Sequence, residues 1–183
     1  MAVRLATILI LLAASVTSAI AEEVISGGFE LIDHNGNTVN ERSYDGKLRL
    51  VFFGFTQCPD ICPTTLLEVR SALNDLGEDA EQVQTLFVSI DRKNDTQEQL
   101  ASYVAAFHPS IIGLTGSEDQ VEAAAAAFNV TYGVQSAAES ASGQEEIFHT
   151  TYLFLMDREG RFLDVFGYGT KGERIADRVG ENL

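Results

Sequence analysis

The chain has 183 residues, of which 45% are hydrophobic and 21% are charged, enough for one domain with a hydrophobic core. Its 27 acidic and 12 basic residues give a formal net charge of −15, and such a surface repels the phosphates of nucleic acids. The composition therefore argues against a nucleic-acid-binding protein.

The N-terminus resembles an export signal. Arg4 precedes an apolar run, and the small-residue pattern Ala19-Ile20-Ala21 precedes Glu22. Residues 1–21 are therefore predicted to be a signal peptide or, alternatively, an uncleaved anchor in the inner membrane. Either prediction places the protein in the periplasm or an equivalent exported compartment, where a disulfide is the resting state of two nearby thiols.

The first half of the chain predicts a hairpin, a buried strand and a helix. Residues 28–41 alternate apolar and polar side chains around Asn35-Gly36, a pair typical of tight hairpin turns. The dense apolar run "KLRLVFFGF" at 47–55 predicts a central strand covered on both faces. The helical spacing at 63–77 predicts a helix that ends at Gly77.

The second half alternates strand and helix patterns before a final hairpin. The predicted elements are strands at 84–91 and 111–116, helices at 95–108 and 117–130, a solvated acidic loop at 135–146, paired strands at 147–157 and 161–168, and a helix at 172–179. This order predicts an α/β fold with a mixed sheet.

Both cysteines lie between the central strand and the following helix, in "FTQCPDICPTT". Cys58 falls in the loop and Cys62 in or near the first helical turn, where the helix dipole favours an anion. At least one thiol is therefore predicted to have a lowered pKa. The carboxyl end of a central strand is also where α/β folds place their sites.

Four interpretations fit two cysteines separated by three residues. A structural disulfide closing so short a loop would add little stability. A dithiol oxidoreductase uses this placement, although with two intervening residues. A thiol peroxidase would have a threonine three residues before its reactive cysteine, where this chain has Phe55 or Pro59. A metal site is the fourth interpretation, because thiolates select copper(I), zinc or iron–sulfur iron, and a tight divalent site needs a further ligand.

Three histidines are available as that ligand. His34 lies in the predicted hairpin turn and is expected to be structural. His108 ends a predicted helix and is expected to cap free carbonyls there. His149 opens an apolar strand after the acidic loop, where position alone favours an ordinary edge residue.

Four segments together resemble one family. "VFFGFTQCPDICPTTLLEV", "VSIDRKNDT", "IIGLTGS" and "FHTTYLFLMDREGRFLDVF", in this order, resemble the Sco/SenC family of copper-binding, thioredoxin-like proteins. The resemblance implies a single thioredoxin-like copper-binding domain over 28–183. It also implies that Cys58, Cys62 and His149 bind copper, as Cu(I) or Cu(II), and so changes the interpretation of His149.

The chain departs from the family pattern at two positions beside the implied ligands. Similar proteins commonly have histidine at Gln57 and aspartate at Phe148, where the aspartate is a candidate acceptor that could orient the imidazole. The common "DPERDTPE" segment is "DRKNDTQE" here, and its Asp91 ends a predicted strand. Asp91 is expected either to face the metal site without binding the metal or to be an ordinary turn residue.

The resemblance implies a metallochaperone rather than an enzyme. It would deliver copper to the dinuclear copper site of a cytochrome c oxidase subunit, and would need an upstream copper donor and a thiol reductant. One alternative is a thiol–disulfide reductase that uses Cys58 and Cys62, without His149, to keep the acceptor's cysteines reduced. A copper or redox sensor is the third hypothesis.

Overall fold

The computed structural model describes residues 25–140, 143 and 145–183, so the predicted signal peptide at 1–21 lies outside the described residues. The strands are β1 (Glu30–Asp33), β2 (Thr38–Asn40), β3 (Leu48–Gly54), β4 (Val83–Ser89), β5 (Ile112–Thr115), β6 (Tyr132–Gln135), β7 (Glu146–His149), β8 (Leu153–Met156) and β9 (Phe162–Phe166). The α-helices are α1 (Ile61–Leu76), α2 (Gln97–Ala105), α3 (Glu118–Ala127) and α4 (Gly172–Gly180), with 3-10 turns η1 (Glu41–Tyr44) and η2 (Gly77–Gln82). None of the helices in these ranges is long and apolar enough to cross a bilayer.

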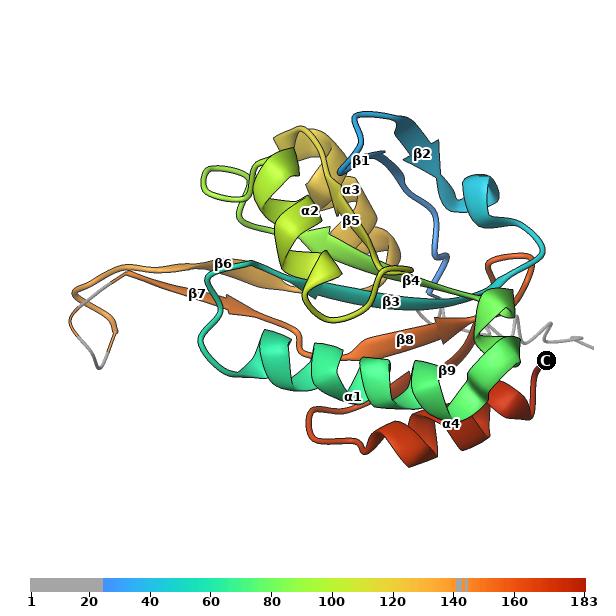
Figure 1. The fold of residues 1–183 in the computed structure, drawn as a ribbon. Helices are drawn as coiled ribbons and strands as arrows, with labels where there is room; N and C mark the ends of the chain where they lie inside the picture. Colours follow the sequence, from blue (N-terminus) through green and yellow to red (C-terminus); the bar gives the residue numbers. More distant parts are fainter. Residues whose placement is uncertain (1–24, 141–142, 144) are drawn as a thin grey trace, which may run out of the picture.

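Seven strands form one mixed sheet in the order β2-β1-β5-β4-β3-β8-β9 (Figure 1). β3, β4 and β5 are parallel to one another, whereas β1, β8 and β9 pair with their neighbours in antiparallel fashion. The mixed sheet flanked by helices confirms the predicted α/β class. The parallel central strands end together beside the cysteine loop.

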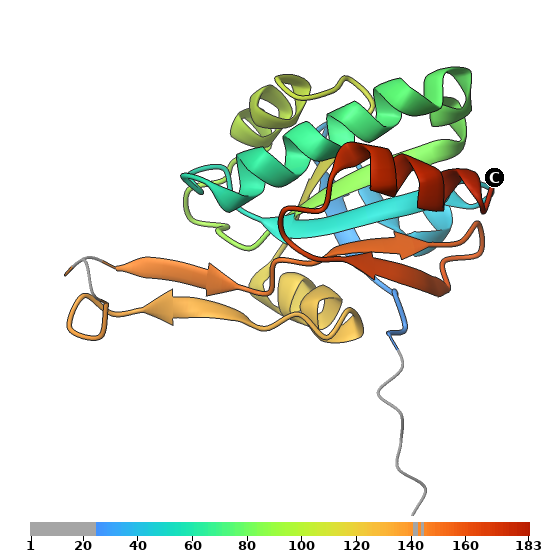
Figure 2. The same ribbon diagram turned by 90° about the horizontal axis from the view of Figure 1, so that it is seen from below.

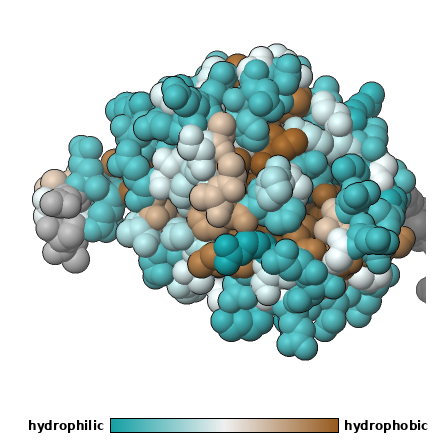
Figure 3. Space-filling view, in the orientation of Figure 1, coloured by the Kyte–Doolittle hydropathy of each residue, from teal (hydrophilic) through white to brown (hydrophobic). Residues whose placement is uncertain are grey.

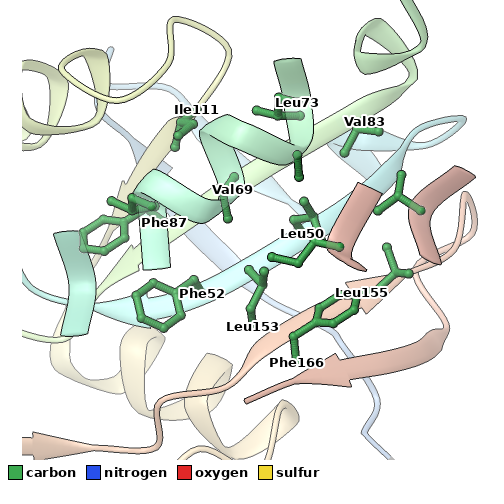
Figure 4. Packing of buried hydrophobic residues seen from close by; sticks show 14 of the residues in the cluster. Leu50, Phe52, Val69, Leu73, Val83, Phe87, Ile111, Leu153, Leu155 and Phe166 are labelled. Carbon is green, nitrogen blue, oxygen red and sulfur yellow. The ribbon is translucent and has the colours of Figure 1, made fainter. Parts of the chain in front are cut away.

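Helices cover both faces of the sheet. α1, α2 and α4 pack on one face and α3 on the other, as seen from below in Figure 2. Every residue of β3 is buried, so its alternating side chains contribute to the hydrophobic cores on both faces of the sheet. Leu50 and Phe52 face α1 (Figure 4), whereas Val51 and Phe53 face α3. β3 thereby fixes the position of the loop that follows it.

The predicted N-terminal hairpin is present and joins the main sheet. β1 pairs with β2 and also with β5. Within the turn, Gly36 has a φ of 88°, and the Asp33 carboxylate accepts hydrogen bonds from the N–H groups of Asn35 and Asn37 at 2.8 Å. Asn35 itself keeps a negative φ, so the turn uses only one left-handed residue.

The helices begin within two residues of the predicted positions, and α3 ends earlier than predicted. α1 begins at Ile61 rather than Pro63, which puts Cys62 in the first turn, where the missing N–H of Pro63 costs nothing. α2 is capped by Thr96, and α3 by Ser117, each through a capping box. α3 ends at Ala127, earlier than predicted, and Asn129 then adopts a left-handed φ of 53°.

The largest difference is a second sheet. The predicted acidic loop at 135–146 begins and ends in strand, because β6 and β7 pair as a two-stranded ribbon from Tyr132↔His149 to Gln135↔Glu146. The predicted strand at 147–157 is therefore two strands, one in the ribbon and one in the main sheet. Figures 1 and 2 show this ribbon extending away from the helices. The prediction missed β6 because its four residues are too short to show periodicity.

The surface agrees with the charge of the chain. In the face seen in Figure 3, hydrophilic residues cover most of the molecule, and hydrophobic atoms are visible in the hollows between them. Among the described residues, the large exposed hydrophobic side chains include Val134 and Phe148 on the ribbon.

Candidate metal centre

The cysteine loop is fixed at both ends by regular structure. It leaves the buried strand β3 at Gly54, and the Cys58 N–H donates to the Phe55 carbonyl at 3.2 Å, forming a tight turn. Asp60 is the N-cap of α1, but its side chain does not bond to the helix backbone. Instead the Cys58 sulfur accepts a hydrogen bond from the Cys62 N–H at 3.4 Å. The first cysteine thus satisfies a free donor at the helix N-terminus.

The two thiols occupy different environments. Cys58 is half-buried, whereas the Cys62 side chain is fully buried in the core. A hydrogen bond from the Cys62 thiol lowers the pKa of Cys58 to about 4 against the opposing effect of burial, with further help from the Cys62 N–H. The same bond, together with burial, raises the pKa of Cys62 above its ordinary value. Cys58 is therefore the thiolate of the pair, as predicted for one of them.

We expect this asymmetry to appear in the pH dependence of alkylation. With a pKa near 4, Cys58 is already ionised at pH 6, so its rate of reaction with iodoacetamide should change little between pH 6 and pH 8. Cys62 should stay unmodified, because it is buried and protonated. Peptide mass spectrometry of the reduced, chelator-treated protein would measure both sites. A rate that rises about tenfold per pH unit over this range, as for an unperturbed thiol, would contradict the assignment.

His149 reaches the cysteines from the far end of the chain. It is the last residue of β7, and its Nε2 lies 3.9 Å from the Cys62 sulfur. Its ring packs edge-on against Phe52 and Phe55, with centroid separations of 6.2 and 6.0 Å. The imidazole is thus held by strand pairing on one side and by aromatic rings on two others.

The imidazole also has a defined tautomer. His149 Nδ1 lies 2.8 Å from the carbonyl oxygen of Thr150. A carbonyl only accepts hydrogen bonds, so Nδ1 carries the proton and a neutral ring leaves the Nε2 lone pair directed at the thiols. Metal-binding histidines are commonly oriented by such a bond to a carbonyl or a carboxylate.

Cys58, Cys62 and His149 together offer three possible metal ligands. One ligand atom from each lies within 4.8 Å of the other two. Two thiolates and an imidazole are soft and borderline donors, a set that suits copper. A pocket of about 350 Å³ opens beside them, lined in part by the apolar side chains of Phe55, Ile61 and Ile147. The cluster is therefore accessible from solvent on one side.

The family model described as SCO1/SenC matches residues 17–183. The chain belongs to the SCO1/SenC family. It is 33% identical to "Protein sco1" of Schizosaccharomyces pombe over 166 residues, which cover 90% of this chain but only 63% of the yeast protein. It is 37% identical to "SCO2-like protein RP587" of Rickettsia prowazekii over 153 residues, 84% of this chain and 74% of that protein. The chain thus spans less than two thirds of the yeast relative.

A solved SCO1/SenC structure has the same fold. The crystal structure of Arabidopsis thaliana ScoI with copper bound superposes with a TM-score of 0.78 at 33% identity, covering 86% of this chain and 97% of that one. The predicted Sco/SenC membership and thioredoxin-like fold are thus confirmed.

This SCO1/SenC chain accommodates its two departures from the family pattern. Gln57 is exposed to solvent. The ring of Phe148 lies across the ribbon against Gly133, where an added Cβ would come 2.7 Å from the ring. The Thr150 carbonyl, rather than a side chain at 148, is the acceptor for His149. The substitution therefore leaves the imidazole with a partner.

Asp91, the residue predicted as a possible neighbour of the site, lies in a turn. Its carboxylate accepts a hydrogen bond from the Asn94 side chain at 2.8 Å, and its carbonyl accepts from the Asn94 and Asp95 N–H groups. The interactions described for it favour the turn interpretation.

Asp95 is the acidic residue that contacts the cysteine loop. Its carboxylate, 2% exposed, accepts from the Thr56 N–H at 3.0 Å and from the hydroxyls of Thr56 and Ser89 at 2.6 Å. The sequence pattern placed Asp95 at the start of the helix predicted at 95–108. The available signal was Gln99, which completes a Thr-x-x-Gln capping box with Thr96 and so leaves Asp95 free for another role.

The other two histidines lie outside the ligand cluster. His34 accepts a hydrogen bond from the Gly113 N–H at 3.0 Å and joins the N-terminal hairpin to β5, in keeping with its predicted structural role. His108 bonds to the Ser110 hydroxyl at 2.8 Å and also accepts from the Ser110 N–H, so it caps a turn rather than helix carbonyls. The prediction that His108 caps free helix carbonyls was therefore wrong.

Gly54 provides a test of how closely Cys62 is packed. A Cβ at this position would lie 2.6 Å from the Cys62 sulfur and 2.9 Å from the Phe87 ring. We expect Gly54→Ala to displace the sulfur and to lower the free energy of unfolding by about 2 kcal/mol through overpacking. Urea denaturation would measure the loss. Gly167→Ala is the matched control, because nothing lies within 4 Å of a Cβ there, and equal losses in both variants would contradict the close packing.

Proposed function

We propose that this protein is an exported copper metallochaperone that delivers copper to the dinuclear copper site of cytochrome c oxidase. Copper is its cargo, held by the sulfurs of Cys58 and Cys62 and by Nε2 of His149. The observation that carries the proposal is the convergence of these three ligand atoms within 4.8 Å, with Nδ1 of the histidine bonded elsewhere. The copper bound to the Arabidopsis relative supports the choice of metal.

The site suits a carrier that must also release its cargo. Three protein ligands leave a coordination position for an incoming ligand from the acceptor. Cys58 and His149 are only half-buried, and the pocket beside them gives an acceptor side chain access. An upstream copper donor, a thiol reductant and an exported location remain parts of the proposal.

A copper titration with two histidine variants tests the proposal. The reduced protein, kept anaerobic, is expected to bind one Cu(I) per chain. His149→Ala should weaken binding by at least about 100-fold, since even residues outside the ligand set typically contribute 10 to 100-fold. His108→Ala is the matched control, because it removes a partly buried imidazole whose Nδ1 bonds to Ser110, and it should leave binding unchanged. Binding that is indifferent to His149 would refute the copper-carrier proposal.

The unequal thiols support a second candidate, a thiol–disulfide reductase. The Cys58 thiolate would attack an acceptor disulfide, forming a mixed disulfide and releasing one acceptor thiolate. Cys62 would then lose its proton and attack the Cys58 sulfur, which releases the second acceptor thiol and leaves a Cys58–Cys62 disulfide. An external thiol must reduce this disulfide before the next cycle. This activity needs no histidine ligand, so it should survive in His149→Ala.

A further inference from the structure

His149 lies at a junction between two sheets. The ladder of the ribbon ends at the pair Tyr132↔His149, and the main sheet resumes only at Leu153 in β8. Residues 150–152 between them belong to neither strand. Strand pairing therefore does not by itself fix the orientation of Thr150, the residue after the histidine. The Thr150 carbonyl is nevertheless the acceptor for His149 Nδ1.

Thr150 and Thr131 close this junction through three hydrogen bonds, which we call the threonine clasp. The Thr150 N–H donates to the Thr131 carbonyl at 2.8 Å. The Thr150 hydroxyl accepts a hydrogen bond from the Thr131 N–H at 3.1 Å and donates one to the Thr131 carbonyl at 3.4 Å. The hydroxyl thus takes the place that a backbone carbonyl would occupy in a continued ladder.

The clasp determines which way the Thr150 carbonyl points. Holding both the N–H and the side chain of Thr150 leaves its carbonyl little freedom, and the Phe52 and Phe55 rings limit rotation of the imidazole. The bond from Nδ1 to this carbonyl is 2.8 Å long. Because Phe148 packs on Gly133 and has no acceptor atom, the side chain before the histidine does not supply this bond.

We propose that Thr150 is a positioning residue: its hydroxyl anchors the peptide whose carbonyl keeps the proton on Nδ1 of His149 and leaves Nε2 facing the two cysteines. The consequence for copper affinity rests on the proposed function. The consequence for the tautomer does not, because it concerns the reduced protein without metal.

The first measurement is the His149 tautomer in the reduced, metal-free protein. Long-range ¹H–¹⁵N correlation at a pH where the ring is neutral distinguishes a proton on Nδ1 from one on Nε2. The wild-type protein and Thr150→Ser are expected to show the Nδ1–H form. Thr150→Val keeps the size of the side chain but removes the hydroxyl, and should shift the population toward Nε2–H. Thr170→Val is the control, because the Thr170 hydroxyl bonds to the Gly167 carbonyl and not to the ribbon or to residues 150–152.

The second measurement is the Cu(I) dissociation constant, obtained by competition with a chromophoric chelator. Thr150→Val should weaken binding by about tenfold, the lower range for residues that orient a ligand. Thr150→Ser and Thr170→Val should match the wild-type protein. A wild-type ring protonated on Nε2, or a Thr150→Val protein with wild-type tautomer and affinity, would overturn the proposal.

The two measurements separate this proposal from the proposed function. A shifted tautomer with unchanged copper affinity would support the positioning role and refute His149 as a copper ligand. If Thr150→Val does not fold, as judged by its ¹H–¹⁵N spectrum, Thr150→Ala removes the same hydroxyl without adding a methyl group beside Thr131. The same two readouts then decide the proposal.

Discussion

Cys62→Ser is expected to abolish tight copper binding while leaving Cys58 reactive. Cys62 is fully buried beside His149 Nε2, so serine would place a hard oxygen where the site offers a soft sulfur. We expect affinity for Cu(I) to fall by at least about 100-fold, more than for a residue that only orients a ligand. Competition with a Cu(I) chelator would measure the loss.

Cys58→Ser is the informative partner of that variant. Both substitutions should abolish copper binding, but only Cys58→Ser should abolish rapid alkylation at pH 6, because Cys58 is the ionised thiol. Ile61→Val, which removes one methyl group next to Cys62, is the control for packing and should retain both properties. Rapid alkylation of Cys62 in Cys58→Ser, or tight copper binding by either serine variant, would contradict the assigned ligands and their roles.

The strand, the loop and the helix around the cysteines could be predicted because their signals are local. A dense apolar run, two cysteines and a helical repeat follow one another within 47–77. The structure confirms this order and places Cys62 in the first turn of α1. Local patterns of this kind do not depend on what the distant parts of the chain do.

The surroundings of His149 could not be predicted from residues alone. The acceptor that fixes its tautomer is a backbone carbonyl, which has no signature in the sequence. The ribbon that carries it depends on pairing β6 with β7 across a loop, and neither four-residue strand shows a periodic pattern. The family resemblance, rather than any local signal, identified His149 as a candidate ligand.

The hydrogen bonds of the buried Asp95 carboxylate could not be predicted from the sequence either. The sequence places it directly before a helix cap, and only the folded chain brings its carboxylate to Thr56, 39 residues earlier. Because Thr56 lies two residues before Cys58, this carboxylate ties the cysteine loop to the segment after β4. Buried groups with several donors are costly to disrupt.

Asp95→Ala is therefore expected to destabilise the fold more than a typical substitution. It would leave the Thr56 N–H and the hydroxyls of Thr56 and Ser89 without their acceptor in a buried site. We expect the free energy of unfolding to fall by about 3 kcal/mol, since unpaired buried polar groups cost about 1–3 kcal/mol each and hydroxyls can partly rearrange. Asp95→Asn keeps one oxygen and should cost about half as much. Urea denaturation would give both values.

Asp91→Ala is the matched control, because it removes a neighbouring, similarly buried carboxylate whose side chain accepts a hydrogen bond from Asn94. It should cost about 1 kcal/mol and leave Cu(I) affinity unchanged, whereas Asp95→Ala should weaken Cu(I) binding by loosening the turn that holds Cys58. Equal losses of stability in the two alanine variants would contradict the special role of Asp95. A wild-type copper affinity in folded Asp95→Ala would show that the loop holds its cysteines without this carboxylate, and that Asp95 stabilises the fold alone.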